Sequence, residues 1–209
     1  MALEPAVTFS LILASGSPQR RAILEQLGVE FTVVVPEVEE LAVGEPRALV
    51  RENALRKARA VAASRGGSPA PDAESATVLG ADTAVVLDGH AYGKPRDEGE
   101  ARTVLERLSG REHEVLGAIA LLGVAGERTA VAATRVRFRP LSASDLHWYL
   151  NCGEWRGRAG GYAIQGRGAA LAERVEGDFW NVVGLPVAEL LRLVPDLLHL
   201  ADGAGLKPS

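Results

Sequence analysis

Short apolar runs alternate with amphipathic stretches through the first third of the chain. Residues 8–14 and 31–35 are largely apolar and predict two strands, the second of them buried. Residues 17–28 begin with Ser-Pro and end with Gly, a pattern typical of a helix between those strands. Apolar positions at helical spacing predict a longer helix over residues 46–64. This alternation of strands and helices favours an α/β fold.

The middle of the chain is richer in strand signals. Residues 65–75 have the Gly, Ser and Pro content of a surface loop. The stretch TVLGADTAVVLDG (77–89) places two apolar runs around a polar centre and closes with Asp-Gly, which predicts a hairpin. A helix is expected from Asp97 to Gly110. Residues 112–124 and 128–138 predict a second hairpin, joined by Ala-Gly-Glu.

The last third of the chain combines helix caps with a glycine-rich segment. Ser142 with Asp145 resembles a capping box for a short helix. A Gly-rich segment (153–168) precedes a strand-like run (169–175), and a last helix is predicted over 186–198. The whole pattern predicts two to four helices packed on a mixed, strongly curved sheet.

Composition narrows the class of protein. With 209 residues, of which 47% are hydrophobic, the chain is expected to form one domain over 8–198, followed by a flexible tail at 199–209. The net charge of −4 argues against a nucleic-acid-binding protein. No apolar run has the length of a membrane span. The single Cys152 fits a reducing compartment, so a cytoplasmic location is expected.

The turn between the first predicted strand and helix combines hydroxyl groups, glycine and arginine. Helix N-termini favour anions, Ser15 and Ser17 add donors, and Arg20 has the geometry to bind a phosphate with two hydrogen bonds. The alternative is an ordinary capped helix with solvated arginines. The chain uses 20 arginines but only three lysines, and Lys57 and Lys94 are the two outside the tail. Both positions could require a compact ammonium group, or could simply have escaped a coding bias.

Acidic residues supply the second kind of candidate chemistry. Asp82 lies inside an apolar strand pattern, where a carboxylate is costly unless it binds a cation or accepts several hydrogen bonds. It is therefore a candidate general base or metal ligand; the alternative is an aspartate in a turn that bends two strands. Glu37, Glu39 and Glu40 form an acidic loop, which is either a solvated surface or a source of Mg²⁺ ligands.

Eight motifs in order resemble the Maf family of nucleoside triphosphate pyrophosphatases over residues 10 to 195. They are LILASGSPQRRAIL (11–24), VEE (38–40), ENALRKA (52–58), GADT (80–83), GKPRD (93–97), LSGREHEV (108–115), AGGYAIQGRGA (159–169) and EGDFWNVVGLP (176–186). The resemblance implies hydrolysis of a nucleoside triphosphate to monophosphate and pyrophosphate with a divalent cation, Mg²⁺ or Mn²⁺. It also implies an α/β fold like that of inosine triphosphate pyrophosphatase, with the nucleotide in a cleft between two lobes, and a homodimer.

The resemblance also implies roles for individual residues. The turn at 15–20 would hold the triphosphate, and Lys57 and Lys94 would be further phosphate or leaving-group partners. Asp82 would activate water, and Glu40 with Asp82 would hold the metal. The two roles of Asp82 compete, because a carboxylate bound tightly to metal is a poorer base; the sequence leaves open which role it has.

Three positions are associated with base selection in the family, and here they are Gln19, Thr83 and Gln165. Thr83 and Gln165 resemble the branch that acts on dTTP and UTP, whereas Gln19 stands where that branch has arginine. Gly117, where many members have threonine, and the long 65–75 linker are further departures. Two other hypotheses remain: a non-catalytic nucleotide-sensing module linked to cell division, and a phosphomonoesterase, which would release orthophosphate.

Overall fold

The computed structural model describes residues 10–65 and 76–199. Residues 8–9, 66–75 and 200–209, on which some of the predictions fall, lie outside the described part of the chain. Within it, one seven-stranded mixed sheet has the order β2-β1-β3-β5-β6-β7, with β4 paired to β3. The strands are β1 (Ser10–Ala14), β2 (Phe31–Val34), β3 (Ala76–Leu87), β4 (His90–Tyr92), β5 (Glu112–Gly123), β6 (Gly126–Phe138) and β7 (Ala172–Glu176).

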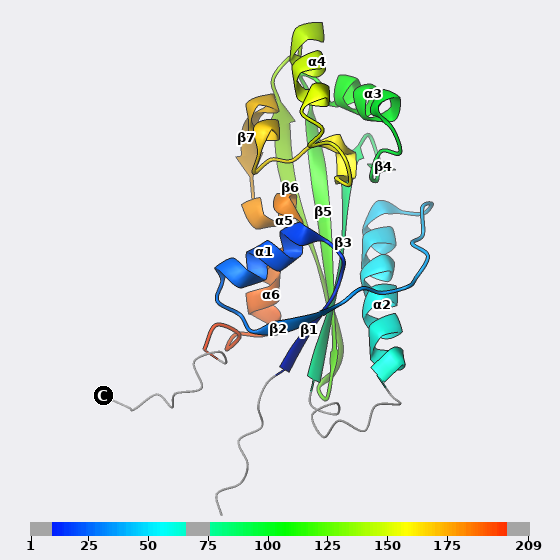
Figure 1. Cartoon of the computed structure of the whole chain (residues 1–209), viewed down its shortest axis with the longest axis vertical. Coiled ribbons are helices and arrows are strands. Elements are labelled where there is room, and N and C mark those ends of the chain that lie inside the picture. The colour runs from blue at the N-terminus through cyan, green and yellow to red at the C-terminus, as the bar shows by residue number, and fades with distance from the viewer. Residues whose placement is uncertain (1–9, 66–75, 200–209) are drawn as a thin grey trace, which may run out of the picture.

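The described residues form six α-helices, more than the two to four expected to pack on the sheet; five lie where a helix was predicted and the short α5 is the additional one. They are α1 (Pro18–Gln26), α2 (Pro46–Arg65), α3 (Glu98–Leu108), α4 (Ala143–Asn151), α5 (Phe179–Val183) and α6 (Val187–Leu193). In Figure 1, β3, β5 and β6 run the length of the molecule, with α3 and α4 at one end and α1, α2 and α6 around the other. None of the helices in the described ranges is long and apolar enough to cross a membrane.

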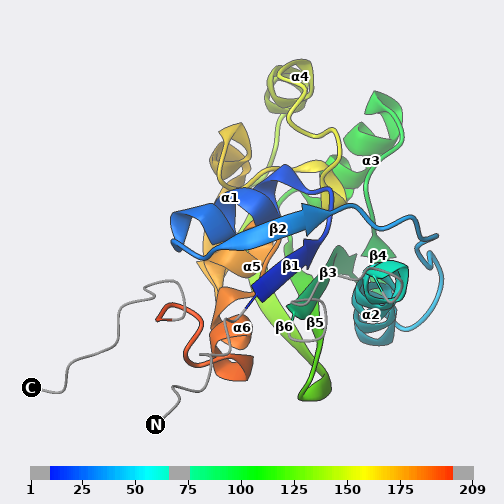
Figure 2. The same cartoon turned by 60° about the horizontal axis from the view of Figure 1, so that its bottom comes forward.

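The two faces of the sheet carry different helices because side chains alternate along each strand. Leu11 and Leu13 of β1 pack with Leu24 of α1 and Leu190 of α6. Ile12 and Ala14, which alternate with these leucines along β1, pack against α2 on the opposite face. Figure 2 shows α2 on one side of the sheet and α1, α5 and α6 on the other. A third apolar cluster joins α3 and α4 to the far ends of β3, β5 and β6.

Local sequence signals were accurate at several helix ends and strand pairs. Asp97 caps α3 by accepting a hydrogen bond from the backbone N of Glu100. Ser142 and Asp145 form the predicted capping box of α4. The long antiparallel pair of β5 and β6 confirms the second predicted hairpin, and the mixed α/β sheet confirms the predicted fold class.

Other predictions of local structure were wrong. Residues 77–89 do not fold back at the polar centre, because β3 continues through it as one strand paired to β5. The predicted Asp-Gly turn is confirmed, since Asp88 and Gly89 join β3 to the antiparallel β4. The strand at 31–35 is not buried, since β2 is an edge strand and Val33 is 42% exposed. The first part of the predicted strand 169–175 is a 3₁₀-helix, and the last helix ends at Leu193. Helix α5 was not predicted.

Helix α5 is tied to the sheet by the buried amide of Asn181. Its Nδ2 donates to the backbone O of Val115 and to Oγ1 of Thr134, at 2.9 and 3.0 Å. A Cβ at Gly117 would collide with Oδ1 of Asn181, so glycine is required at this position by the way α5 packs. The anchor holds the end of α5 beside the cleft described below.

Candidate active site

The predicted site residues gather in one cleft, of about 710 Å³, at the carboxyl end of β1. Strand β1 pairs with β3 only as far as Ala14 and Gly80, and β3 continues beyond it. Ligands of α/β proteins commonly bind where parallel strands end in this way. All ten predicted residues line the cleft: Ser15, Ser17, Gln19, Arg20, Glu40, Lys57, Asp82, Thr83, Lys94 and Gln165.

Gly80 determines how closely α2 approaches the sheet. A Cβ at this position would collide with the backbone O of Ala54 and press on Ala58, so the helix packs directly on the glycine. Asp82 follows two residues later on the same face of β3, which directs its side chain toward α2. Asn53 and Lys57 lie one turn apart on the facing side of that helix. The Gly-Ala-Asp motif thus combines a packing residue with a candidate site residue.

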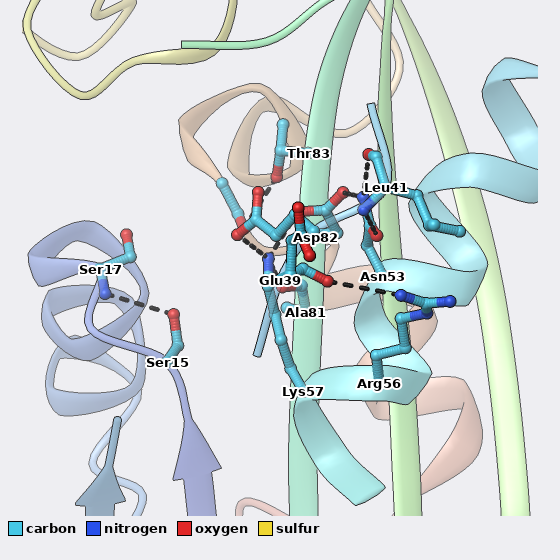
Figure 3. Close-up of polar contacts among 12 residues, drawn as sticks. Ser15, Ser17, Glu39, Leu41, Asn53, Arg56, Lys57, Ala81, Asp82 and Thr83 are labelled. Atoms are coloured by element: carbon cyan, nitrogen blue, oxygen red, sulfur yellow. Dashed lines mark hydrogen bonds and ion pairs between the residues drawn. The ribbon is translucent and has the colours of Figure 1, made fainter. Parts of the chain in front are cut away.

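A buried ammonium joins the two predicted metal-binding carboxylates. Nζ of Lys57 lies 2.7 Å from Oδ1 of Asp82 and 2.7 Å from Oε1 of Glu40. Lys57 is 5% exposed and Asp82 8% exposed, whereas the Glu40 side chain is 43% exposed. Figure 3 shows the lysine reaching from α2 to Asp82 on β3. The ammonium is therefore neither a solvated end of a surface side chain nor a free phosphate contact in this structure.

Asn53 contacts the second oxygen of Asp82 and was missing from the predicted set. Its Nδ2 donates to Oδ2 of Asp82 at 3.2 Å and to the backbone O of Leu41 at 3.0 Å. Its Oδ1 accepts the backbone N–H of Leu41 at 2.7 Å (Figure 3). One buried amide thus fixes both the carboxylate and the loop that carries Glu40. The signal was its spacing of four residues from Lys57.

Arg20 cross-links the opposite side of the cleft. Its Nε donates to the backbone O of Gly184 at 2.9 Å, Nη1 to Oγ of Ser15 at 3.0 Å and Nη2 to Oγ1 of Thr83 at 3.2 Å. Three of its five N–H groups are thereby engaged, which leaves two for a ligand. Ser17 does not cap α1 with its side chain; its hydroxyl donates to Oε1 of Gln19 at 3.2 Å instead.

The cleft is electropositive although the chain is acidic. Among the described residues that line it are four cationic side chains and two carboxylates, whereas the whole chain has a net charge of −4. Partial burial works to raise the pKa of Glu40, but Lys57, Lys94 and Arg20 outweigh it and hold that pKa below its usual value. Burial lowers the pKa of Arg20, against the attraction of Asp82 and Glu40. The cleft therefore favours an anionic ligand.

The carboxylates of Glu40 and Asp82 fit a divalent cation. They already converge on one positive centre, and they offer the oxygen ligands that Mg²⁺ prefers. A cation held by two carboxylates takes its remaining ligands from water and from substrate phosphates. Glu37 and Glu39 of the acidic loop are exposed and do not line the cleft.

His113 is a packed residue and does not line the cleft. It is 3% exposed, its Nε2 lies 3.0 Å from the hydroxyl of Tyr162, and burial lowers its pKa to about 4. Tyr162 and Arg158 line the cleft and were not among the predicted site residues. Both lie in the glycine-rich segment (153–168). Arg158 was identifiable there as a cation among glycines, whereas nothing in the sequence singled out Tyr162.

The fold and the cleft define an α/β protein with an electropositive cleft beside a carboxylate–ammonium cluster. The family model described as Maf-like protein matches residues 10–197, so the chain belongs to the Maf family. It is 49% identical to a dTTP/UTP pyrophosphatase of Symbiobacterium thermophilum, over 93% of this chain and 98% of that protein. It is 47% identical to a dTTP/UTP pyrophosphatase of Thermus thermophilus, over 88% and 92% of the two chains.

Among solved structures, the Staphylococcus aureus Ham1 protein aligns with a TM-score of 0.43 and 15% identity, over 62% of this chain and 71% of that one. A match at this level carries no argument about function.

Proposed function

We propose that this protein is a nucleoside triphosphate pyrophosphatase, which hydrolyses its substrate to a nucleoside monophosphate and pyrophosphate. The observation that carries the proposal is the buried pair of Asp82 and Lys57, joined by the partly exposed Glu40, inside an electropositive cleft. The curated relatives named above are pyrophosphatases of this kind and align over nearly their whole length.

In the proposed reaction, water attacks the α-phosphorus and the bond from that phosphorus to the bridging oxygen of the β-phosphate breaks. Asp82 accepts the proton of the attacking water. Lys57 donates to Oδ1 of Asp82 and Asn53 donates to Oδ2, so each oxygen keeps one lone pair that can accept a hydrogen bond from the water. The two hydrogen bonds fix the orientation of the carboxylate, which a general base requires.

A divalent cation, Mg²⁺ or Mn²⁺, would be held by Glu40 and Asp82 and would neutralise charge on the leaving pyrophosphate. The Lys57 ammonium occupies the same two carboxylates, so ammonium and cation compete for them. An ammonium released from the carboxylates is free to bind a phosphate oxygen. Lys94 faces the same cleft from the turn after β4 and contributes a second ammonium.

The substrates proposed are UTP and dTTP, with weaker selectivity than a strict pyrimidine enzyme. Gln19, Thr83 and Gln165 line the cleft that contains Asp82, which suits residues that contact the base or sugar. Gln19 offers a neutral amide where arginine is expected. A charge-assisted hydrogen bond contributes about 1.5–3 kcal/mol, so its loss relaxes discrimination roughly ten- to a hundred-fold.

A nucleotide panel tests the proposal. The wild type with Mg²⁺ is expected to release pyrophosphate from UTP and dTTP, and chelation of the metal is expected to stop the reaction. Release of orthophosphate instead would favour a phosphomonoesterase. Binding of nucleotides without turnover would favour a nucleotide-sensing module. Light scattering on the same sample tests the expected homodimer.

A further inference from the structure

Two of the four cations in the cleft already have partners. Lys57 is neutralised by Asp82 and Glu40, and three N–H groups of Arg20 are bound to the protein. For Lys94 and Arg158, in contrast, no ion pair and no side-chain hydrogen bond occurs among residues 10–65 and 76–199. Arg20 makes its three hydrogen bonds to neutral oxygens, whereas Lys94 and Arg158 are the cleft cations that no described side chain engages by an ion pair or a hydrogen bond.

Arg158 is partly buried and its Nε is unsatisfied. This nitrogen is inaccessible to solvent and has no hydrogen-bond partner in the described part of the chain. Burial lowers the pKa of Arg158, against the attraction of Tyr149 and Glu154. The carboxylate of Glu154 accepts the backbone N–H of Arg167 at 2.7 Å and forms no ion pair with Arg158. A half-buried guanidinium without an ion pair in the described part of the chain is costly, so an anion in the cleft that Arg158 lines is expected to offset that cost.

A backbone hydrogen bond fastens the segment that carries Arg158 to the turn that carries Lys94, and both residues line the cleft. In this bond the N–H of Gly160 donates to the backbone O of Gly93 at 2.9 Å. Gly160 has a φ of +65° and leaves no room for a Cβ against Val85, so the close approach requires glycine. Two like charges on adjoining segments repel each other unless an anion lies between them.

We propose that Arg158, together with Lys94, binds the pyrophosphate portion of the substrate and the product that leaves. This inference rests on the proposed pyrophosphatase function and adds a substrate-binding residue to it. The α-phosphate has to lie at Asp82, within reach of the Lys57 ammonium that contacts this carboxylate. The β- and γ-phosphates carry most of the negative charge of a nucleoside triphosphate, and Lys94 and Arg158, which have no ion pair in the described part of the chain, are available to bind them. An arginine suits this role because its planar fork binds phosphate oxygens in pairs.

Binding of inorganic pyrophosphate and of UMP, each measured by calorimetry with Mg²⁺, tests the inference. Arg158→Gln is expected to weaken pyrophosphate binding about ten- to a hundred-fold, the effect of one charge-assisted contact, and to change UMP binding less than about twofold. Arg158→Lys is expected to recover part of the loss, since it retains the charge without the fork. Arg156→Gln is the matched control, because Arg156 stacks on Trp155 at 4.5 Å and does not line the cleft.

The inference is overturned if Arg158→Gln binds pyrophosphate like the wild type, or if UMP binding falls as much as pyrophosphate binding. A wild type that does not bind pyrophosphate overturns it as well. Thermal unfolding of each variant separates a lost contact from a lost fold. The proposed function fails on a different result: a wild type that releases no pyrophosphate from any nucleotide, whatever its affinity for pyrophosphate.

Discussion

Replacing Lys57 by methionine removes the ammonium that compensates two carboxylates while retaining an apolar side chain of similar length. Asp82, 8% exposed, then keeps a hydrogen bond only from the amide of Asn53, and Arg20 is the remaining cation that attracts it. Glu40, whose side chain is 43% exposed, can turn to water. The destabilisation therefore comes almost entirely from Asp82.

The magnitude follows from the burial of the pair. Removing one partner of a buried ion pair costs about 3–5 kcal/mol, whereas a surface pair contributes about 0–1 kcal/mol. For a chain of this length 1 kcal/mol shifts Tm by about 2–4 °C, so Lys57→Met is expected to lose about 6–20 °C without divalent cations. A divalent cation at a hundred times its Kd stabilises the folded Lys57→Met variant by about 2.7 kcal/mol. The wild type gains less, because the cation has to displace the ammonium.

Thermal unfolding with and without Mg²⁺ measures both effects. Arg59→Met is the matched control, since Arg59 lies on the same helix and forms an exposed ion pair with Glu127 at 2.9 Å. The control is expected to lose at most about 4 °C, with the same response to Mg²⁺ as the wild type. Equal stability of Lys57→Met and Arg59→Met would refute the reasoning on burial. An equal Mg²⁺ shift in Lys57→Met and wild type would refute competition for the carboxylates.

Four further predictions follow from the site and the core. Asp82→Asn is expected to fold and to lower kcat at least about 10²-fold, the effect of losing a general base; turnover within a few-fold of wild type removes Asp82 from the mechanism. Lys94→Arg is expected to impair turnover although the charge is kept, and a fully active variant would show that no compact ammonium is needed there. Gln19→Arg is expected to sharpen selectivity for UTP and dTTP in kcat/KM across canonical and methylated triphosphates; unchanged selectivity would count against the role of Gln19. Because burial lowers the pKa of His113 to about 4, the unfolded chain takes up the proton first as pH falls below about 6.5, and stability is lost down to pH 4. This loss amounts to about 3 kcal/mol and should be absent in His113→Asn, as urea unfolding at pH 7 and pH 4 would show.

The local part of the fold was accessible from the sequence because it depends on neighbours along the chain. A Ser-Pro helix start, the cap at Asp97 and the capping box at Ser142 use contacts within a few residues, and each lies where the pattern indicated. The ten candidate residues were identifiable for a related reason. Their side chains carry charged, hydroxyl or amide groups, and they stand in motifs that resemble those of a known family.

Contacts between distant segments were decided only by the tertiary structure. Residues 77–89 have the turn-like Gly-Ala-Asp in their centre, but pairing with β5 keeps β3 straight, and the glycine serves the approach of α2. That approach brings Lys57 within 2.7 Å of Asp82, 25 residues further along the chain, and makes Asn53 part of the site. Likewise, one backbone hydrogen bond from Gly160 to Gly93 fastens the segment that carries Arg158 to the turn that carries Lys94. Charge compensation depends on distance in space, which spacing along the chain does not specify. The sequence by itself therefore determined which side chains could do chemistry, and the packing of α2 and the glycine-rich segment on β3 decided which of their charges remain available for a ligand.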